Sequence, residues 1–169
     1  MEPEEVEAFL AAALEHCPAY HPQFLVALRA GLRQGEILGL RWGDLQFGTS
    51  EKDPNRYILV QRRWYRGKFS TPKGNKTRRV YMSRELREAL LARRDDRLLK
   101  AWQNGRNSIA DELVFPGETE TKPISVRNLS ENCFLPTLEH ANLRRFRFHD
   151  LRHYAEFRNM PNDRAIAAA

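Results

Sequence analysis

The sequence predicts an α+β fold, a mostly α-helical single domain with a small three-stranded antiparallel sheet. Three observations lead to this prediction. Apolar residues recur at spacings of three and four along much of the chain, which is the period of amphipathic helices. Two short runs near the middle are rich in β-branched and aromatic residues. The 169 residues suffice for one domain and contain no internal repeat and no convincing linker.

The first third of the chain is expected to form three helices. The first begins at Pro3, because proline and the two glutamates that follow it suit a first helical turn, and it ends near Pro18. A second helix around residues 24–28 is closed by Gly31, and a short third helix covers residues 36–40. The apolar stripe of the first helix consists of Val6, Phe9, Leu10, Ala13 and Leu14.

The middle of the chain is expected to supply the sheet. Residues 57–60 and 78–82 have the composition of strands, and polar and apolar residues alternate in the second run. The segment 70–75 between them contains proline, glycine and asparagine, which are typical of a turn. Residues 44–47 are expected to add a third, short strand.

The remainder of the chain is expected to be helical, apart from one polar connection over residues 104–122. A long helix before this connection is N-capped by Ser83. Another helix covers about 126–140, where Pro136 is expected to kink or end it, and the last helix begins near His149. The inward-facing residues expected in the long helix, which runs to about Trp102, are Leu86, Leu90, Leu98 and Trp102.

Basic residues are in excess and unevenly distributed. The net charge is +6, and the isoelectric point is about 9.6, which favours a polyanionic partner such as nucleic acid. The window 61–80 holds eight Lys and Arg, interleaved with aromatic residues, and no acidic residue. A solvated face without a partner would explain either basic cluster alone, but two acid-poor clusters favour a surface that follows phosphates. The second cluster comprises Arg144, Arg145, Arg147 and Arg152.

Other features argue against secreted, membrane and metal-binding proteins. No apolar run approaches the roughly 18 residues that span a bilayer. The first seven residues carry four glutamates, unlike a secretory signal. Cys17 and Cys133 match no metal-binding spacing, and we expect two buried, reduced thiols. A cytoplasmic location is therefore expected.

Three motifs occur in a suggestive order. The first is Gly31-Leu-Arg-Gln-Gly-Glu-Ile, continued by Leu-Arg-Trp-Gly-Asp44. The second is Thr71-Pro-Lys followed by Arg78-Arg-Val, and the third is Phe148-His-Asp-Leu-Arg-His. Together they resemble the arginine box, the β-hairpin lysine segment and the His-x-x-Arg box of the tyrosine recombinases, the phage integrase family. The resemblance extends from Val6 to about Phe157.

The chemistry of phosphodiesters explains the two arginines independently of the resemblance. Strand transfer concentrates negative charge on non-bridging phosphate oxygens, and forked guanidinium groups match that geometry. Arg33 and Arg152 are therefore the expected phosphate clamp. Glu36 would hold Arg33 in position, although a simple ion pair within one helical turn would also explain this spacing. Trp42 and Asp44 are interpreted as structural residues, Trp42 as a core side chain and Asp44 as a cap or turn residue.

The resemblance implies roles for three further residues. It makes Lys73 the general acid that protonates the leaving 5′ oxygen, with Lys76 as the nearby alternative. His149 would donate a hydrogen bond to the phosphate or carry the nucleophile's proton, because its spacing places it on one helical face with Arg152. The residues expected to contact DNA phosphates are Arg62, Arg63, Lys76, Arg78 and Arg79.

The resemblance also implies a nucleophilic tyrosine well beyond the His-x-x-Arg box. Only 17 residues follow Arg152, and Tyr154 comes too early. The nucleophile is thus expected to be absent from residues 1–169, together with the family's N-terminal core-binding domain. The intact protein is expected to be a bacterial or phage-encoded, nucleoid-associated recombinase that assembles on double-stranded DNA and needs no cofactor or metal. It is expected to cleave and rejoin DNA strands through a 3′-phosphotyrosyl intermediate. This chain alone is expected to bind DNA without cutting it.

Three alternatives were weighed. A non-catalytic DNA-binding protein with the same fold is the serious one. A type IB topoisomerase would share the catalytic logic. A zinc peptidase is suggested by His149-Asp-x-x-His153, but an aspartate is too short a base there and no third ligand is evident.

Overall fold

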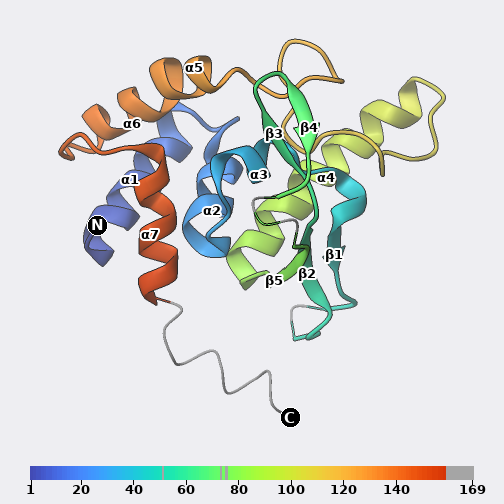
Figure 1. Cartoon of the computed structure of the whole chain (residues 1–169), viewed down its shortest axis with the longest axis horizontal. Coiled ribbons are helices and arrows are strands. Elements are labelled where there is room, and N and C mark those ends of the chain that lie inside the picture. Colours follow the sequence, from blue (N-terminus) through green and yellow to red (C-terminus); the bar gives the residue numbers. More distant parts are fainter. Residues whose placement is uncertain (51, 73, 75, 159–169) are drawn as a thin grey trace.

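The computed structural model describes residues 1–50, 52–72, 74 and 76–158. Most of the helices gather on one side of the molecule, whereas the long helix α4 extends past the strands (Figure 1). Helix α4 contacts the sheet, since Arg87 donates to the Phe47 carbonyl at 2.6 Å. The helices are α1 (Pro3–His16), α2 (His21–Ala30), α3 (Gln34–Leu38), α4 (Arg84–Gln103), α5 (Val126–Leu129), α6 (Leu135–His140) and α7 (Phe148–Arg158), with a 3₁₀ turn η1 (Trp42–Asp44) and a π-helical segment η2 (Ser130–Phe134). The predicted α+β class is confirmed.

The helical side is built around a cluster of phenylalanine rings. Phe9 of α1 packs edge-on against Phe24 of α2, with ring centroids 5.1 Å apart. Phe134 of η2 lies 5.7 Å from Phe9, and Phe148 at the start of α7 lies 5.6 Å from Phe134. Such contacts add to the free energy of burying the rings themselves. They fix α7 against α2, which brings the third motif of the sequence to the first.

The predicted three-stranded antiparallel sheet is confirmed, with the strand order β1-β2-β5. Its strands are β1 (Leu45–Phe47), β2 (Arg56–Val60) and β5 (Arg78–Tyr81). In β2, Ile58 and Val60 are buried, and Ile58 pairs with Leu45 on one side and Val80 on the other. The alternation predicted for β5 is also correct, because Arg79 and Tyr81 are exposed.

A second, two-stranded sheet was not predicted. Strands β3 (Arg63–Tyr65) and β4 (Lys68–Ser70) form a hairpin that stands out from the sheet (Figure 1). Arg66 and Gly67 at its tip have φ of +49° and +79°, the backbone that two-residue hairpin turns require. Trp64 and Phe69 pair across it, with centroids 4.7 Å apart. The interpretation of residues 70–75 as a simple turn was wrong at its start, since Ser70 ends β4.

Helix α4 begins as predicted, with the Ser83 hydroxyl accepting the Leu86 N–H at 3.2 Å. Leu86 and Leu90 are buried. The prediction for Trp102 was wrong, because its side chain is 70% exposed and Ala101 takes the inward position in the last turn. The same error of helix phase occurs in α1, where Leu14 is 59% exposed.

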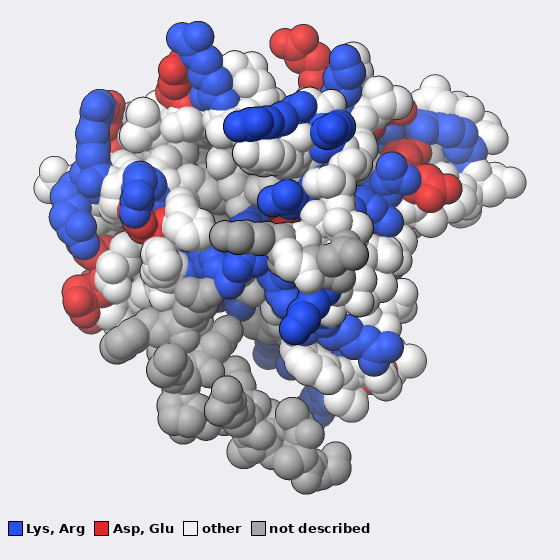
Figure 2. Space-filling view, viewed as in Figure 1, with Lys and Arg blue, Asp and Glu red and all other residues white. Residues whose placement is uncertain are grey.

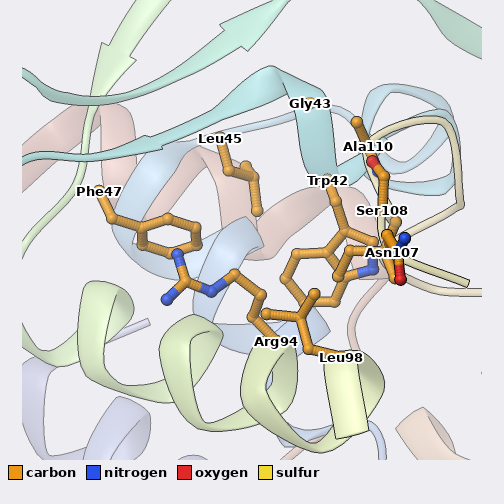
Figure 3. A pocket seen from close by; sticks show the side chains of 10 residues that line it. Trp42, Gly43, Leu45, Phe47, Arg94, Leu98, Asn107, Ser108 and Ala110 are labelled. Atoms are coloured by element: carbon orange, nitrogen blue, oxygen red, sulfur yellow. The ribbon is translucent and has the colours of Figure 1, made fainter. Parts of the chain in front are cut away.

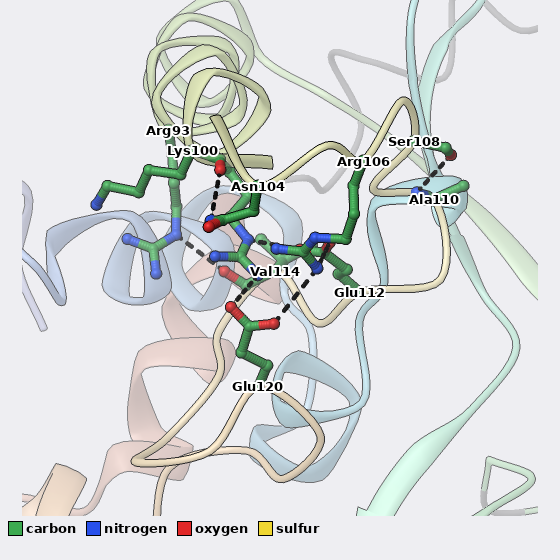
Figure 4. A network of polar contacts seen from close by, with 10 residues as sticks. Arg93, Lys100, Asn104, Arg106, Ser108, Ala110, Glu112, Val114 and Glu120 are labelled. Carbon is green, nitrogen blue, oxygen red and sulfur yellow. Dashed lines mark hydrogen bonds and ion pairs between the residues drawn. The ribbon is translucent and has the colours of Figure 1, made fainter. Parts of the chain in front are cut away.

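The connection between α4 and α5 is tied to α4 by ionic contacts (Figure 4). Arg97 of α4 donates to Glu112 and, at 2.6 Å, to Glu120. Arg106 donates to Glu112 at 2.6 Å, and Arg93 donates to the Val114 carbonyl at 2.9 Å. The apolar stretch of the connection, residues 113–115, is buried against the core.

The segment from α5 to α6 stays helical across Pro136, which lies in the first turn of α6, directly after the π-helical segment η2. The expectation of buried thiols holds for Cys133, whereas Cys17 is only half-buried, and both are free. No helix in the described part of the chain is long and apolar enough to cross a membrane.

Candidate active site

Arg33 lies at a sharp change of direction between α2 and α3. Helix α2 ends at Gly31, whose φ of +62° is the left-handed conformation that favours glycine. Arg33 follows at the N-cap of α3, and its side chain is 43% exposed. The glycine therefore makes the turn that presents this arginine at the surface.

Glu36, in the first turn of α3, is 1% exposed and is surrounded by donors. Its Oε2 accepts the Arg33 backbone N–H at 2.9 Å, and its Oε1 lies 3.2 Å from the Arg33 guanidinium. Arg78 of β5 donates two further bonds, at 2.9 Å to Oε1 and 2.7 Å to Oε2. Burial raises the pKa of this carboxyl, but the bonds from Arg78 and Arg33 outweigh it and leave the pKa below its ordinary value.

Two glycines let α3 approach β3 closely. A Cβ on Gly35 would lie 2.7 Å from the Trp64 carbonyl oxygen, and a Cβ on Gly39 would lie 3.0 Å from the Arg63 Cα. No side chain larger than hydrogen fits at either position without a shift of backbone. The spacing of these glycines, four residues apart on a short helix, was the sequence signal for this contact, and it was missed.

Arg152 is brought to the same place by α7. Its guanidinium donates to the Gly31 carbonyl at 2.7 Å, across 121 positions of sequence. The close approach of α7 to α2 again depends on Gly31, since a Cβ there would lie 3.3 Å from the Ala155 Cβ. The structure therefore holds the Arg152 guanidinium at the backbone of Gly31, which lies two residues before Arg33 in the sequence.

Of the other predicted catalytic residues, the structure describes His149 and the alternative Lys76 but not Lys73. His149 is exposed, one helical turn before Arg152, and its ring meets that of His153 edge-on at 4.9 Å. Lys73 lies outside the described residues, and Lys76 is exposed. Among the described residues, no group of three or more His, Cys, Asp and Glu side chains could hold a metal, so nothing there supports the zinc peptidase alternative.

The guanidinium groups of two predicted DNA contacts are already engaged with buried carboxylates. Arg78 binds Glu36, as described above, and Arg62 pairs with Asp44. Asp44 also accepts the Arg41 N–H at 2.9 Å, which confirms its expected role as a cap, and Trp42 is buried as expected. The interpretation of Arg62 and Arg78 as surface phosphate ligands thus overlooked their internal partners.

Of the remaining predicted contacts, Lys76 and Arg79 are exposed, whereas Arg63 is half-buried and donates to the Ser70 hydroxyl at 3.2 Å. Arg79 is exposed and its guanidinium lies 4.6 Å from the centre of the Tyr57 ring. Arg63 and Arg66 lie 4.9 and 5.3 Å from the centre of the exposed Tyr65 ring in the β3–β4 hairpin. Figure 2 shows Lys and Arg side chains crossing the middle of this face, from the region of α2 toward the sheet, with few acidic groups between them.

A shallow recess of about 270 Å³ lies elsewhere, between η1, β1 and α4. Trp42, Phe47 and Leu98 form its apolar lining, and the Arg94 side chain extends over Phe47 (Figure 3). None of Arg33, Glu36, Arg78 and Arg152 lines this recess.

Comparisons with known proteins agree on one family. The family described as Phage integrase matches residues 1–162. The ICEBs1 integrase of Bacillus subtilis (strain 168) is 27% identical over 165 residues, which cover 89% of this chain and 40% of that protein.

Solved structures share the fold. The Tn1549 transposon integrase, solved in complex with circular intermediate DNA, gives a TM-score of 0.70 at 21% identity, covering 98% of this chain and 56% of the other. XerA recombinase gives 0.66 at 22% identity, covering 98% of this chain and 53% of the other. The chain thus spans about half of the solved relatives and less of the Bacillus one. The family match covers nearly the whole chain, and the bond from Arg152 to Gly31 joins the third sequence motif to the first. The chain therefore belongs to the phage integrase family.

Proposed function

We propose that residues 1–169 are part of the catalytic domain of a site-specific DNA recombinase and activate the scissile phosphate. The observation that carries the proposal is the bond from Arg152 to the Gly31 carbonyl, which brings the third motif within two residues of Arg33. Two guanidinium groups on one basic face suit the non-bridging oxygens of a phosphodiester.

The proposed reaction assigns each group a definite step. A tyrosine hydroxyl attacks phosphorus, a bond to the tyrosine oxygen forms, and the bond to the 5′ oxygen breaks. Arg33 and Arg152 stabilise the charge that develops on the non-bridging oxygens, where each lost donor typically costs about 10²–10³ in rate. His149 would hydrogen-bond the phosphate or take the hydroxyl proton. Lys73 is the sequence-based candidate for returning a proton to the 5′ oxygen.

Duplex DNA is the proposed partner, and the exposed basic residues would hold its backbone. Arg79 on β5 and the hairpin residues Arg63, Arg66 and Lys68 make no ion pair with an acidic side chain within the described part of the chain. Such contacts set affinity and register but do not read bases. We therefore propose that this chain binds duplexes with little sequence preference, and that the intact protein assembles on DNA in the cytoplasm.

The isolated chain is proposed to act only as a DNA-binding module. Its five tyrosines include none in the sequence context of the nucleophile. Tyr154, beside the His-x-x-Arg motif, is buried, and Tyr57 and Tyr65 lie under arginine side chains. This observation favours the non-catalytic alternative for the chain by itself.

The test is a titration of labelled duplexes of unrelated sequence at several salt concentrations. If about five phosphates are contacted, log K should fall against log salt with a slope of about −4 to −5. Arg152→Ala should flatten this slope by about one. The matched control is Arg127→Ala, which removes the same charge from α5, where Arg127 pairs with Glu131. Salt-independent binding, or equal effects of the two variants, would overturn the proposed DNA-binding site. An adduct that survives denaturation would overturn only the proposal that the isolated chain binds DNA without cutting it.

A further inference from the structure

Arg78 makes a contact that its place on an exposed basic strand does not suggest. Its two terminal nitrogens bracket both oxygens of Glu36, at 2.9 and 2.7 Å. The two residues are 42 positions apart, on β5 and α3. Arg33 makes only one side-chain contact with the same carboxylate, at 3.2 Å. Arg78 therefore binds the Glu36 carboxylate more closely than the Arg33 side chain does.

The physical consequence follows from burial. A carboxylate that is 1% exposed must be paired, because removing one partner of a buried ion pair leaves an uncompensated charge. A two-bond fork satisfies both oxygens at once. Without Arg78, the only other guanidinium bonded to Glu36 in the described chain is that of Arg33. Glu36 would then draw Arg33 inward and neutralise it.

We propose that Arg78 is a positioning residue that occupies Glu36 and so leaves the Arg33 guanidinium available to the phosphate. This inference rests on the proposed function, since it concerns how Arg33 reaches its ligand. Glu36 alone orients Arg33, through the backbone N–H at 2.9 Å and the single side-chain contact. Because Arg78 already neutralises Glu36, Glu36 orients Arg33 without also neutralising its charge. The trio carries one net positive charge, and that charge remains at Arg33.

The test is a double-mutant cycle read out as duplex affinity of the 169-residue chain. Arg78→Gln should weaken binding about 10-fold, which is about 1.4 kcal/mol of binding free energy, because Arg33 would lose its bond to phosphate. Glu36→Gln added to Arg78→Gln should restore affinity to within about 3-fold of the parent, since no buried charge then competes for Arg33. Arg78→Lys should retain much of the affinity, because it keeps the charge and loses only the fork.

The matched control repeats the cycle at Arg79, the adjacent residue with the same charge and no contact with Glu36 among those described. Arg79→Gln should also weaken binding, but Glu36→Gln should recover far less affinity in that background. Equal recovery in both backgrounds would show that only overall charge matters and would overturn the proposal. So would a double variant as weak as Arg78→Gln, which is the result expected if Arg78 touches DNA directly.

Folding and function are kept separate in this design. Thermal unfolding of every variant identifies those that fail to fold, and the charge-neutral double variant and Arg78→Lys keep the buried site paired if Arg78→Gln does not fold. Failure of the parent chain to bind DNA would refute the proposed function. A parent that binds normally, with no dependence of the Arg78 effect on Glu36, would refute the role of Arg78 alone.

Discussion

Replacing Gly35 with alanine tests whether the approach of α3 to β3 builds the site. The added Cβ would lie 2.7 Å from the Trp64 carbonyl oxygen, closer than real Cβ contacts allow. The neighbour is backbone, so it cannot rotate away, and either α3 or the hairpin has to move. Because Arg33 and Glu36 lie on either side of Gly35, a shift of α3 moves both of them.

Two effects of opposite sign meet in this variant, which makes its result informative. Alanine is favoured over glycine inside a helix by about 0.8–1.0 kcal/mol, so local propensity alone predicts a more stable protein. Overpacking typically costs about 1–3 kcal/mol. We expect the clash to prevail and to lower the melting temperature by several degrees, at about 2–4 °C per kcal/mol for a chain of this size.

The assay combines thermal unfolding with duplex titration. Gly35→Ala should melt at a lower temperature and bind DNA more weakly than the parent. Gln34→Ala, one position earlier in the same helix, is the matched control. Its melting temperature should be no lower than that of the parent, except for the small effect of losing contacts of the Gln34 side chain. A Gly35→Ala protein that is more stable and binds DNA as the parent does would refute the close contact of α3 and β3.

Two further predictions concern titratable groups. The pKa of Glu36 is lowered on folding, so its charged form stabilises the protein above the ordinary carboxyl pKa, and this contribution is lost as pH falls through the lowered value. Between pH 7 and pH 3, urea unfolding should therefore show a smaller loss of stability in the folded Glu36→Gln/Arg78→Gln variant than in the parent. An equal loss of stability would contradict the assignment. Burial, and secondarily the nearby Cys17, raise the pKa of Cys133 to about 12. Iodoacetamide at pH 8 should therefore leave Cys133 unmodified in the folded protein and alkylate it in urea, as measured by peptide mass mapping. Rapid alkylation of the native protein would refute the buried thiol.

Features that depend on a few neighbouring residues were predictable from the sequence. Gly31 ends α2 and Ser83 caps α4, because a left-handed turn and an N-cap are local requirements that few residue types meet. The three strands of the main sheet followed from composition and alternation in short windows. The arginine and His-x-x-Arg motifs pointed to the family, which the comparisons confirm, and to the phosphate site that we propose.

Features that depend on partners far apart in the chain required the tertiary structure. The β3–β4 hairpin was hidden because its strands are only three residues long, so their pairing and the turn at Arg66 decide them rather than propensity. Trp102 seemed to face inward by spacing, yet a shift of one position along the helix buries Ala101 instead.

The chemistry of the site divides in the same way. The sequence by itself predicted which residue types would meet a phosphate, because guanidinium groups are the matching donors wherever they occur. Only the tertiary structure decided which arginine faces outward and which faces a buried carboxylate. Arg78 and Arg79 are adjacent and identical in type, but successive residues of a strand point to opposite faces, so one binds Glu36 and the other lies exposed over Tyr57. Burial, which no short window of sequence reveals, separates their roles.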